Sequence, residues 1–325
     1  MSQPPILPVY DTRVVDIAII LPCLNEEKAI RDTVLSFRSA VPESRIFIID
    51  NGSTDATVAR ALEAGAIVKH CAMRGKGHAL RHAFASIDAD VFLVADGDNT
   101  YDAGCGGELI RLLLDNDLDM VVGVRNHTSP DAYRVGHQLG NRMFNLLVSW
   151  TFGRQFSDIF SGYRVLSRRF VKSFPALSVG FDIETEMSVH AIQLCMPTSE
   201  VLTTYRERGA GSQSKLRTYR DGLLILWRII MLLKYLRPFA LFGAIAVAIA
   251  MLALALGMPV ILDFLATGLV ARFPTAVAAA SLGVMAMISF VTGMILDSIA
   301  VAQRENKRLF YLAASPRVQG RPRSE

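Results

Sequence analysis

Two long stretches without a charged residue constrain this chain most. They are residues 239–262 and 273–296, each 24 residues long, and a helix needs roughly 20 apolar residues to cross a bilayer. A short linker joins them. Two buried core helices are the alternative, but uncharged runs of this length are rare in soluble domains. We therefore predict a hairpin of two transmembrane helices over 239–300.

Basic residues beside these runs predict their orientation. Arginine and lysine gather before the first run and after the second, whereas the linker carries only Arg272. Cytoplasmic flanks are enriched in such residues, so both ends of the hairpin and a basic tail over 301–325 are expected on the cytoplasmic side of the cell (inner) membrane. Residues 216–238 have their charges on one side of a helical wheel and predict an amphipathic interfacial helix. A helix packed on the domain is the alternative.

The remaining composition excludes several classes of function. The net charge of +4 comes largely from the flanks of the apolar runs and suits an anionic membrane leaflet better than nucleic acid. The four cysteines lack metal-ligand spacing and are expected to be reduced thiols. Residues 1–13 have no apolar core, so they are expected to form a loose leader and not a signal peptide.

Five apolar segments alternate with helical patterns in the first part of the chain. Strands are expected at 14–22, 45–50, 66–70, 90–96 and 119–125. Unbroken apolar strands of this kind are typical of a parallel sheet with helices on both faces. The sequence therefore predicts an α/β domain over 14–215, with ligands beyond the carboxyl ends of its strands.

Polar motifs follow these strands. Asn25 and Glu26 follow the first strand and Asp50 closes the second, although helix capping or a tight turn would explain them equally well. The motif RGKGHALRHAF places Lys76 at a helix start, where backbone amides favour phosphate oxygens. That loop lacks the spacing of a Walker motif, and a purely structural loop is the alternative.

The motif ADGDNTYD carries two acids, Asp96 and Asp98, directly after an apolar strand. Two carboxylates at positions i and i+2 can reach one Mg²⁺ or Mn²⁺, which fills its other positions with water and substrate phosphates. Such a cation offsets the charge that builds on a leaving diphosphate. A polar turn at a strand end is the alternative, and the accompanying motifs favour the metal site.

Further polar and charged residues occur nearer the apolar runs, and the last of them are cations. Arginine binds phosphate in a bidentate manner, so these cations suit the phosphate of a lipid-embedded acceptor, with attraction to anionic headgroups as the alternative. The whole group comprises Arg125, Asp158, Ser161, Arg164, Asp182, Glu184, Glu186, Arg206, Arg208 and Lys215.

Taken together, these motifs resemble those of the family 2 glycosyltransferases of the GT-A fold. More narrowly, the chain looks like the polyprenyl-phosphate sugar transferases, the group of dolichol-phosphate mannose synthase and GtrB-like proteins. The resemblance covers roughly residues 14–238, and the two-helix tail matches the GtrB-like architecture. It is carried by PCLNEE, IIDNGSTDAT, RGKGHALRHAF, ADGDNTYD, VVGVRN, SDIFSGYRVLSRR, GFDIETEM and YRERGAGSQSK.

The resemblance implies a GT-A (Rossmann-like), mostly parallel sheet and a role for each matching residue. The nucleotide sugar would be bound by Pro22, Asn25, Glu26, Asp50, Lys76 and Asp96. Arg125, Arg206 and Lys215 would hold the acceptor phosphate. Asp96 and Asp98 would bind Mg²⁺ or Mn²⁺, and Thr100 stands where many relatives have Gln, so its hydroxyl or a water would complete that site. The catalytic set is Asp96, Asp98 and Asp158.

The resemblance also implies the reaction, an inverting transfer of a hexose from a UDP- or GDP-linked sugar to undecaprenyl or dolichyl phosphate, by a homo-oligomer. A phosphate monoester has a second pKa near ~6, so its oxygen can attack without a general base. Orienting roles, such as holding the sugar or the arginines, are therefore expected for Asp158, Asp182, Glu184 and Glu186. A transferase acting on a hydroxyl and an inactive partner of a lipid-linked sugar flippase are the alternatives.

Overall fold

The computed structural model describes residues 15–127, 156–177, 183–205, 234 and 237–314. It divides the chain into two units: unit 1 comprises Met1–Lys215 and Lys307–Glu325, and unit 2 comprises Leu216–Asn306. The expected leader, nearly all of the expected interfacial helix and the end of the expected tail lie outside the described residues.

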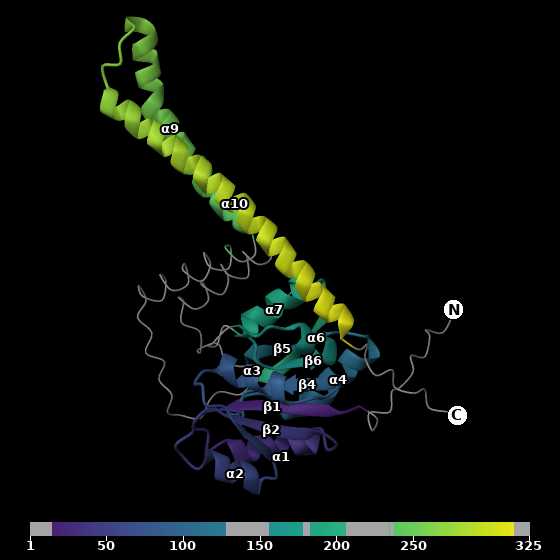
Figure 1. The fold of residues 1–325 in the computed structure, drawn as a ribbon. Coiled ribbons are helices and arrows are strands. Elements are labelled where there is room, and N and C mark those ends of the chain that lie inside the picture. Colours follow the sequence, from purple (N-terminus) through teal and green to yellow (C-terminus); the bar gives the residue numbers. More distant parts are fainter. Residues whose placement is uncertain (1–14, 128–155, 178–182, 206–233, 235–236, 315–325) are drawn as a thin grey trace, which may run out of the picture. The chain divides into compact units, whose positions relative to one another are not determined.

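Unit 1 is built on a seven-stranded sheet of order β3-β2-β1-β4-β6-β5-β7 (Figure 1). β6 runs antiparallel to β4 and β5, and the other pairings are parallel. The fold is therefore the mostly parallel α/β sheet that the sequence predicts. The strands are β1 (Ile17–Cys23), β2 (Arg45–Asp50), β3 (Ile67–His70), β4 (Val91–Val94), β5 (Met120–His127), β6 (Arg164–Ser167) and β7 (Thr198–Tyr205).

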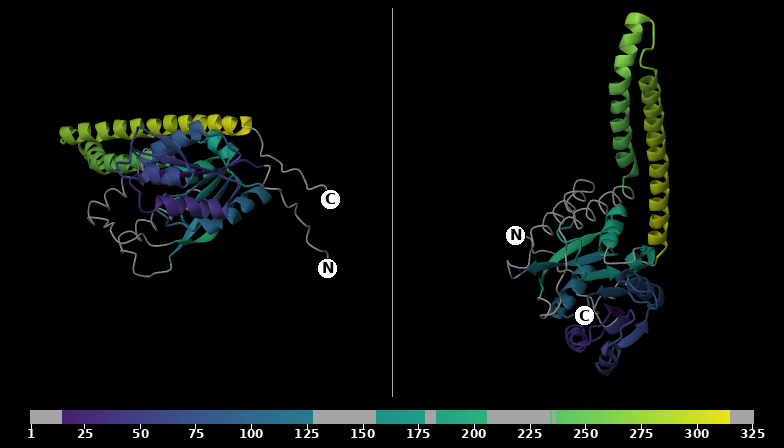
Figure 2. Two further views of the ribbon diagram at one scale, coloured as in Figure 1. Left: turned by 90° about the horizontal axis from the view of Figure 1, so that it is seen from below. Right: turned by 90° about the vertical axis from the view of Figure 1, so that its left-hand side faces the viewer.

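Helices cover both faces of this sheet (Figure 2). Along β1, Ala18 and Ile20 point into one apolar core, and Ile19 and Leu21 point into the other. The first core is closed by α3 (Lys76–Ser86), α6 (Arg168–Ser173) and α7 (Ile183–Gln193). The second is closed by α1 (Ile30–Ala40), α2 (Thr57–Glu63) and α4 (Gly106–Asp115), which the 3-10 helix η2 (Ala103–Cys105) precedes. This arrangement explains why the strands read as unbroken apolar runs.

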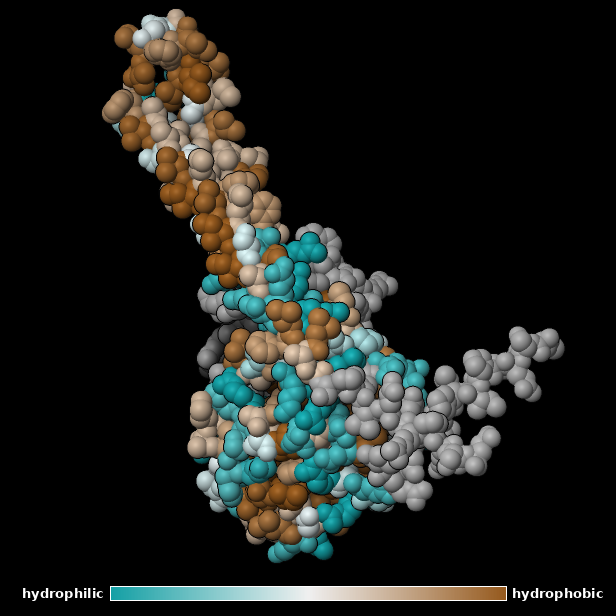
Figure 3. Space-filling view, turned by 45° about the vertical axis from the view of Figure 1, so that its right-hand side comes forward, coloured by the Kyte–Doolittle hydropathy of each residue, from teal (hydrophilic) through white to brown (hydrophobic). Residues whose placement is uncertain are grey.

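Unit 2 contains two long apolar helices, α9 (Pro238–Thr267) and most of α10 (Phe273–Ala313). Both are long and apolar enough to cross a membrane. Only 6% and 11% of their most apolar stretches are buried, which does not fit the core helices of a soluble domain. Their hydrophobic side chains cover the outside of the pair (Figure 3). These features indicate association with a membrane.

The two helices of unit 2 pack as an antiparallel pair through small residues and one aromatic contact. The Ser289 hydroxyl donates to the carbonyl of Phe242 (3.1 Å), and the rings of Phe239 and Phe290 lie 5.6 Å apart. Gly257 faces Ala279. Small residues let helix backbones approach closely where no water drives them together.

The last turns of α10, Lys307–Ala313, belong to unit 1, and Lys307 and Arg308 donate to Gln193 and Leu194 at the end of α7. Tyr311 is 7% exposed, and its hydroxyl donates to Asp119 Oδ2 at 2.8 Å. The guanidinium groups of Arg169 and Arg308 lie over this ring at 5.0 and 5.1 Å. The segment expected as a basic tail therefore begins as a helix whose side chains complete unit 1.

Candidate functional site

The predicted donor-site residues gather at the carboxyl edge of the parallel strands. Pro22 lies near the end of β1, paired with Ile49 of β2, and Asp50 is the last residue of β2. Asp96 follows β4 by two residues, and Lys76 begins α3. Parallel pairing of β1 with β2 and β4 brings these ends to one side of the sheet, as expected for ligands of such folds.

The carboxylate of Asp50 is buried and held from two sides. Its Oδ1 accepts a hydrogen bond from the Ser53 amide (3.0 Å), and its Oδ2 lies 3.1 Å from Nδ1 of His70 at the end of β3. Burial raises the pKa of Asp50, but the hydrogen bonds from Ser53 and the contact with His70 outweigh it, so the pKa lies below its ordinary value. Asp50 therefore presents a fixed negative charge.

Asn25 links the loop after β1 to the turn after β2. Its backbone is left-handed (φ 58°), and its Oδ1 accepts from the Thr54 amide at 2.8 Å. The neighbouring Glu26 amide donates to Thr57 Oγ1 (2.8 Å). α1 begins at Ile30, and no side chain that the structure describes caps its first turn. Asn25 is therefore not a helix cap, which was the alternative explanation for this residue.

The loop that delivers Lys76 is held by Asn51. Asn51 Nδ2 donates to the Met73 carbonyl (2.6 Å), and the Gly75 amide donates to Asn51 Oδ1 (2.5 Å). Gly75 has φ 127°, a conformation that side chains rarely adopt, and it turns the chain directly into α3. This turn places Lys76 at the helix start with its side chain only 7% exposed.

The Lys76 ammonium lies between two carboxylates. It contacts Asp96 Oδ1 and lies 2.5 Å from Glu184 Oε1, on the first turn of α7. Burial lowers the pKa of Lys76, but the charges of Asp96 and Glu184 outweigh it and raise the pKa, so the group is a cation. A Cβ on Gly162 would lie 3.0 Å from Nζ, so a larger residue there would press on the ammonium.

Asp98 and Thr100 form a closed turn after β4. The Thr100 hydroxyl donates to Asp98 Oδ1 at 2.6 Å, and the Thr100 amide lies 3.2 Å from the same oxygen. Thr100 is 1% exposed, whereas Asp98 is partly exposed. The threonine therefore orients the carboxylate of Asp98, and its hydroxyl proton is directed at that carboxylate.

The residues present fit a hard divalent cation. Asp96 and Asp98 offer carboxylate oxygens and are partly exposed. Among the described residues, no group of three or more His, Cys, Asp or Glu side chains forms a ready-made metal cage. Mg²⁺ and Mn²⁺ sites that act on phosphates use one or two carboxylates, with water and substrate oxygens as the other ligands.

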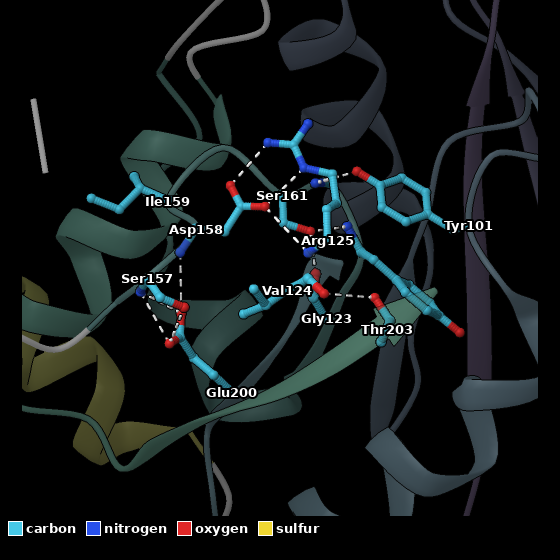
Figure 4. A network of polar contacts seen from close by, with 12 residues as sticks. Tyr101, Gly123, Val124, Arg125, Ser157, Asp158, Ile159, Ser161, Glu200 and Thr203 are labelled. Atoms are coloured by element: carbon cyan, nitrogen blue, oxygen red, sulfur yellow. Dashed lines mark hydrogen bonds and ion pairs between the residues drawn. The ribbon is translucent and has the colours of Figure 1, made fainter. Parts of the chain in front are cut away.

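Arg125 and Asp158, predicted for different roles, form one ion pair (Figure 4). Arg125 Nε and Nη2 donate to the two oxygens of Asp158 at 2.8 and 2.9 Å, and the guanidinium lies 5.7 Å from the ring centre of Tyr205. Burial raises the pKa of Asp158, but the Arg125 hydrogen bonds and charge lower it further than burial raises it. Asp158 therefore orients Arg125 and is a weak base.

A second layer of contacts fixes the segment that carries Asp158. Glu200 of β7 accepts hydrogen bonds from the Ser157 amide (2.8 Å) and hydroxyl (2.7 Å) (Figure 4). From the other side, the fully buried Arg164 donates to the carbonyls of Ser161 (2.8 Å) and Ile159 (2.6 Å). The position of Arg125 thus depends on side chains of β6 and β7.

The sequence-based interpretation missed parts of this arrangement. An orienting role is expected for Glu184, but its pairing with Lys76 is not apparent from the sequence. Nothing in a single sequence marks Glu200, whose importance comes from the pairing of β7 beside β5. Tyr101, whose hydroxyl accepts from the Gly162 amide (2.9 Å), was also missed. The predicted acceptor residues Arg206 and Lys215, and Asp182, lie outside the described residues.

Comparison with known proteins identifies relatives of this chain. The family model of glycosyl transferase family 2 matches residues 18–174. The glycosyltransferase AglJ of Haloferax volcanii is 35% identical over 234 residues, which cover 71% of this chain and 77% of that protein. Protein RfbJ of Shigella flexneri is 44% identical over 124 residues, 38% of this chain and 96% of RfbJ.

Solved structures share the fold. Glucosyl-3-phosphoglycerate synthase from Mycobacterium tuberculosis, in complex with Mn²⁺ and UDP-glucose, superposes with a TM-score of 0.55 at 21% identity, covering 69% of this chain and 79% of that chain. The same enzyme with Mg²⁺ and UDP gives a TM-score of 0.56 at 22% identity, with 69% and 80% covered. Unit 1 is thus of the GT-A type.

Proposed function

Since the chain belongs to glycosyl transferase family 2, we propose that it transfers a hexose, with inversion, from a nucleotide sugar to a polyprenyl phosphate at the cytoplasmic face of the cell membrane. This proposal is carried by the combination of two features in one chain. The carboxylates of Asp96 and Asp98 lie near the buried Lys76 cation, and the same chain has two candidate membrane-spanning helices. A relative that is 28% identical, Agl6 of Haloferax volcanii, is named a hexosyltransferase.

On this proposal the donor lies along the carboxyl edge of β1, β2 and β4. Asp50, held by Ser53 and His70, receives the base or ribose, with Pro22, Asn25 and Glu26 around the same pocket. Lys76 supplies positive charge near the diphosphate. Solved neighbours contain UDP with Mn²⁺ or Mg²⁺, which supports the same kind of donor and cation here.

Asp96 and Asp98 would hold the Mg²⁺ or Mn²⁺ ion. When bound there, the ion supplies positive charge that offsets the charge building on the departing diphosphate. The hydroxyl of Thr100 donates to Asp98 Oδ1, which supports a role for Thr100 in orienting that carboxylate, with water completing the ligands of the ion.

The acceptor phosphate is proposed to bind Arg125, together with Arg206 and Lys215. Asp158 holds the Arg125 guanidinium in one orientation through two hydrogen bonds, which lowers the entropy cost of phosphate recognition. The phosphate oxygen is already ionised, so it attacks without proton removal, and the protein positions the reactants and the leaving group. The lowered pKa of Asp158 supports a phosphate acceptor over a hydroxyl, which would need a base.

A donor and acceptor panel tests this function. Purified full-length protein in detergent is supplied with Mn²⁺ or Mg²⁺, UDP- and GDP-hexoses, and one acceptor: undecaprenyl phosphate, dolichyl phosphate, the matching polyprenol, or phosphoglyceric acid, which the solved neighbour binds. Transfer is expected with a lipid phosphate. Transfer to the polyprenol alone would support the hydroxyl alternative, and no transfer or donor hydrolysis under any condition would support the flippase-partner alternative.

Asp158→Asn separates the two enzymatic alternatives. A phosphate acceptor needs no base, so this variant is expected to slow transfer by loosening Arg125, and raising the pH should not rescue it. Complete loss of turnover with unchanged binding of donor and acceptor would instead assign a general base to Asp158.

A further inference from the structure

Unit 1 contains a buried group of charges that the proposed reaction only partly uses. Lys76 and Arg164 are the cations, with exposures of 7% and 0%, and Glu184 is a 4% exposed carboxylate beside them. Glu184 Oε1 forms an ion pair with the Lys76 ammonium. Its Oε2 is buried and has no hydrogen-bond partner among the residues that the structure describes.

Lys76 and the proposed divalent cation need the same carboxylate. The ammonium contacts Asp96 Oδ1, and Asp96 is one of the two acids that would hold Mg²⁺ or Mn²⁺. Like charges in contact repel strongly where water is excluded. A bound divalent cation and an ammonium resting on Asp96 are therefore in competition, and the ammonium needs a second counter-charge when the ion is present.

Glu184 is placed to be that counter-charge. It lies in the first turn of α7, where the helix dipole stabilises a negative group. Arg164, whose Nη1 donates to Ser188 Oγ at 2.9 Å, is a further cation nearby, and the Ser188 hydroxyl donates to the Glu184 carbonyl (3.1 Å). These contacts tie the first turns of α7, and with them the backbone of Glu184, to Arg164 of β6 without involving Asp96.

We propose that Glu184 is a positioning residue, which holds the Lys76 ammonium beside the donor diphosphate so that Asp96 becomes available to the divalent cation. The unpartnered Oε2 gives the ammonium a second oxygen to bind as it leaves Asp96. This inference rests on the proposed metal site at Asp96 and Asp98. Glu184 would affect metal affinity indirectly, by changing where the Lys76 ammonium lies.

Mn²⁺ binding to the full-length protein, measured by the loss of the free Mn²⁺ signal in EPR without any sugar substrate, tests the inference. Glu184→Gln keeps the shape but removes the charge, so Lys76 pairs with Asp96 alone, and Mn²⁺ affinity is expected to fall by about tenfold or more. Lys76→Gln removes the competing cation, and its Mn²⁺ affinity is expected to equal or exceed that of wild type. The double variant is expected to regain the wild-type affinity.

Controls separate this inference from a general loss of structure and from failure of the metal site. Glu186→Gln, on the same helix, is the matched control and is expected to leave Mn²⁺ affinity unchanged. If Glu184→Gln does not fold, Lys76→Gln still decides, because weaker Mn²⁺ binding in that variant would overturn the competition. Unchanged affinity in a folded Glu184→Gln would overturn the inference alone. Absence of Mn²⁺ binding by wild type would overturn the metal site and the inference with it.

Discussion

Single residues at this site are held by neighbours that sequence motifs do not reveal. Thr100 is predicted as a metal ligand because it stands two residues after Asp98, where many relatives have Gln, and in the structure its hydroxyl donates to Asp98. Asp158 was grouped with the catalytic acids, and it forms a bidentate pair with Arg125. Motifs identify which residues matter, whereas side-chain partners decide what each one does.

Thr100→Val tests the orienting role. The change keeps the side-chain shape and removes one hydrogen bond to a carboxylate, worth about 1.5–3 kcal/mol, so transfer is expected to fall by roughly tenfold or more and Thr100→Ser to restore most of it. Asp98→Ala is expected to abolish metal-dependent transfer without unfolding the protein. Initial rates and circular dichroism measure both effects, and a loss in Thr100→Val as complete as in Asp98→Ala would instead make Thr100 a ligand.

His190 of α7 makes unit 1 sensitive to acid. Burial lowers its pKa from 6.5 to about 3, with Lys307 adding to the effect, and its Nε2 lies 2.9 Å from the Ser173 hydroxyl. The unfolded chain binds a proton below pH 6.5 and the folded chain does not, so stability is lost as the pH falls from 6.5 toward 3. His190→Gln is expected to flatten this fall in denaturant midpoints. An unchanged slope would contradict the assignment.

At the scale of elements, β1–β5 and α1–α4 could be predicted because apolar runs and strand-end polar motifs mark them. β6 and β7 could not. β6 begins with Arg164, a fully buried arginine that reads as a surface residue, and β7 is an edge strand of mixed exposure. Both contribute contacts that position Asp158. The placement of the proposed donor residues at the strand ends was therefore predictable, and the contacts that support the proposed acceptor residue Arg125 were not.

Glu200→Gln tests that support. The variant weakens the hydrogen bonds to the Ser157 amide and hydroxyl, which loosens Asp158 and through it Arg125. We expect the KM for the lipid phosphate to rise by about three- to tenfold, as for a charged hydrogen bond partly lost, while the KM for the nucleotide sugar stays constant. Glu63→Gln, at the exposed end of α2, is the control. Equal rises in both KM values would contradict a role confined to the acceptor side.

At the scale of the whole molecule, the chain leaves unit 1 before Leu216 and returns to it at Lys307. The returning segment is part of the fold, because Tyr311 donates to the buried Asp119, which also accepts from Ser167 Oγ (2.6 Å) and from Arg169. Asp119 is 0% exposed, and each lost donor leaves its charge less compensated.

Tyr311→Phe measures how much the returning segment contributes to the stability of unit 1. It removes one hydrogen bond to a buried carboxylate and keeps the ring between the two arginines, so unit 1 is expected to lose about 1.5–3 kcal/mol of unfolding free energy. Leu309→Ala, at an exposed position of the same helix, is the control. Denaturant unfolding of the full chain, followed by near-ultraviolet circular dichroism, gives the difference, and equal midpoints for wild type and Tyr311→Phe would show that Asp119 does not depend on this donor.

The apolar surface of unit 2 gives a second prediction at this scale. With most of α9 and α10 apolar and exposed, the expressed chain is expected to remain in the membrane fraction after an alkaline carbonate wash and to be released by detergent. Removal of residues 238–306 is expected to abolish this retention. Release of the intact chain by carbonate would place it among peripheral proteins.

The return of the chain at Lys307 has a consequence for biosynthesis. Asp119 and its donor Tyr311 are 192 positions apart, and a ribosome adding about 5–20 residues per second makes the second roughly 10–40 seconds after the first. Both apolar helices emerge during that interval. Unit 1 is therefore completed only after the two apolar helices have been synthesised. A chain whose synthesis stops before α10 is complete would lack the Tyr311 hydrogen bond to Asp119.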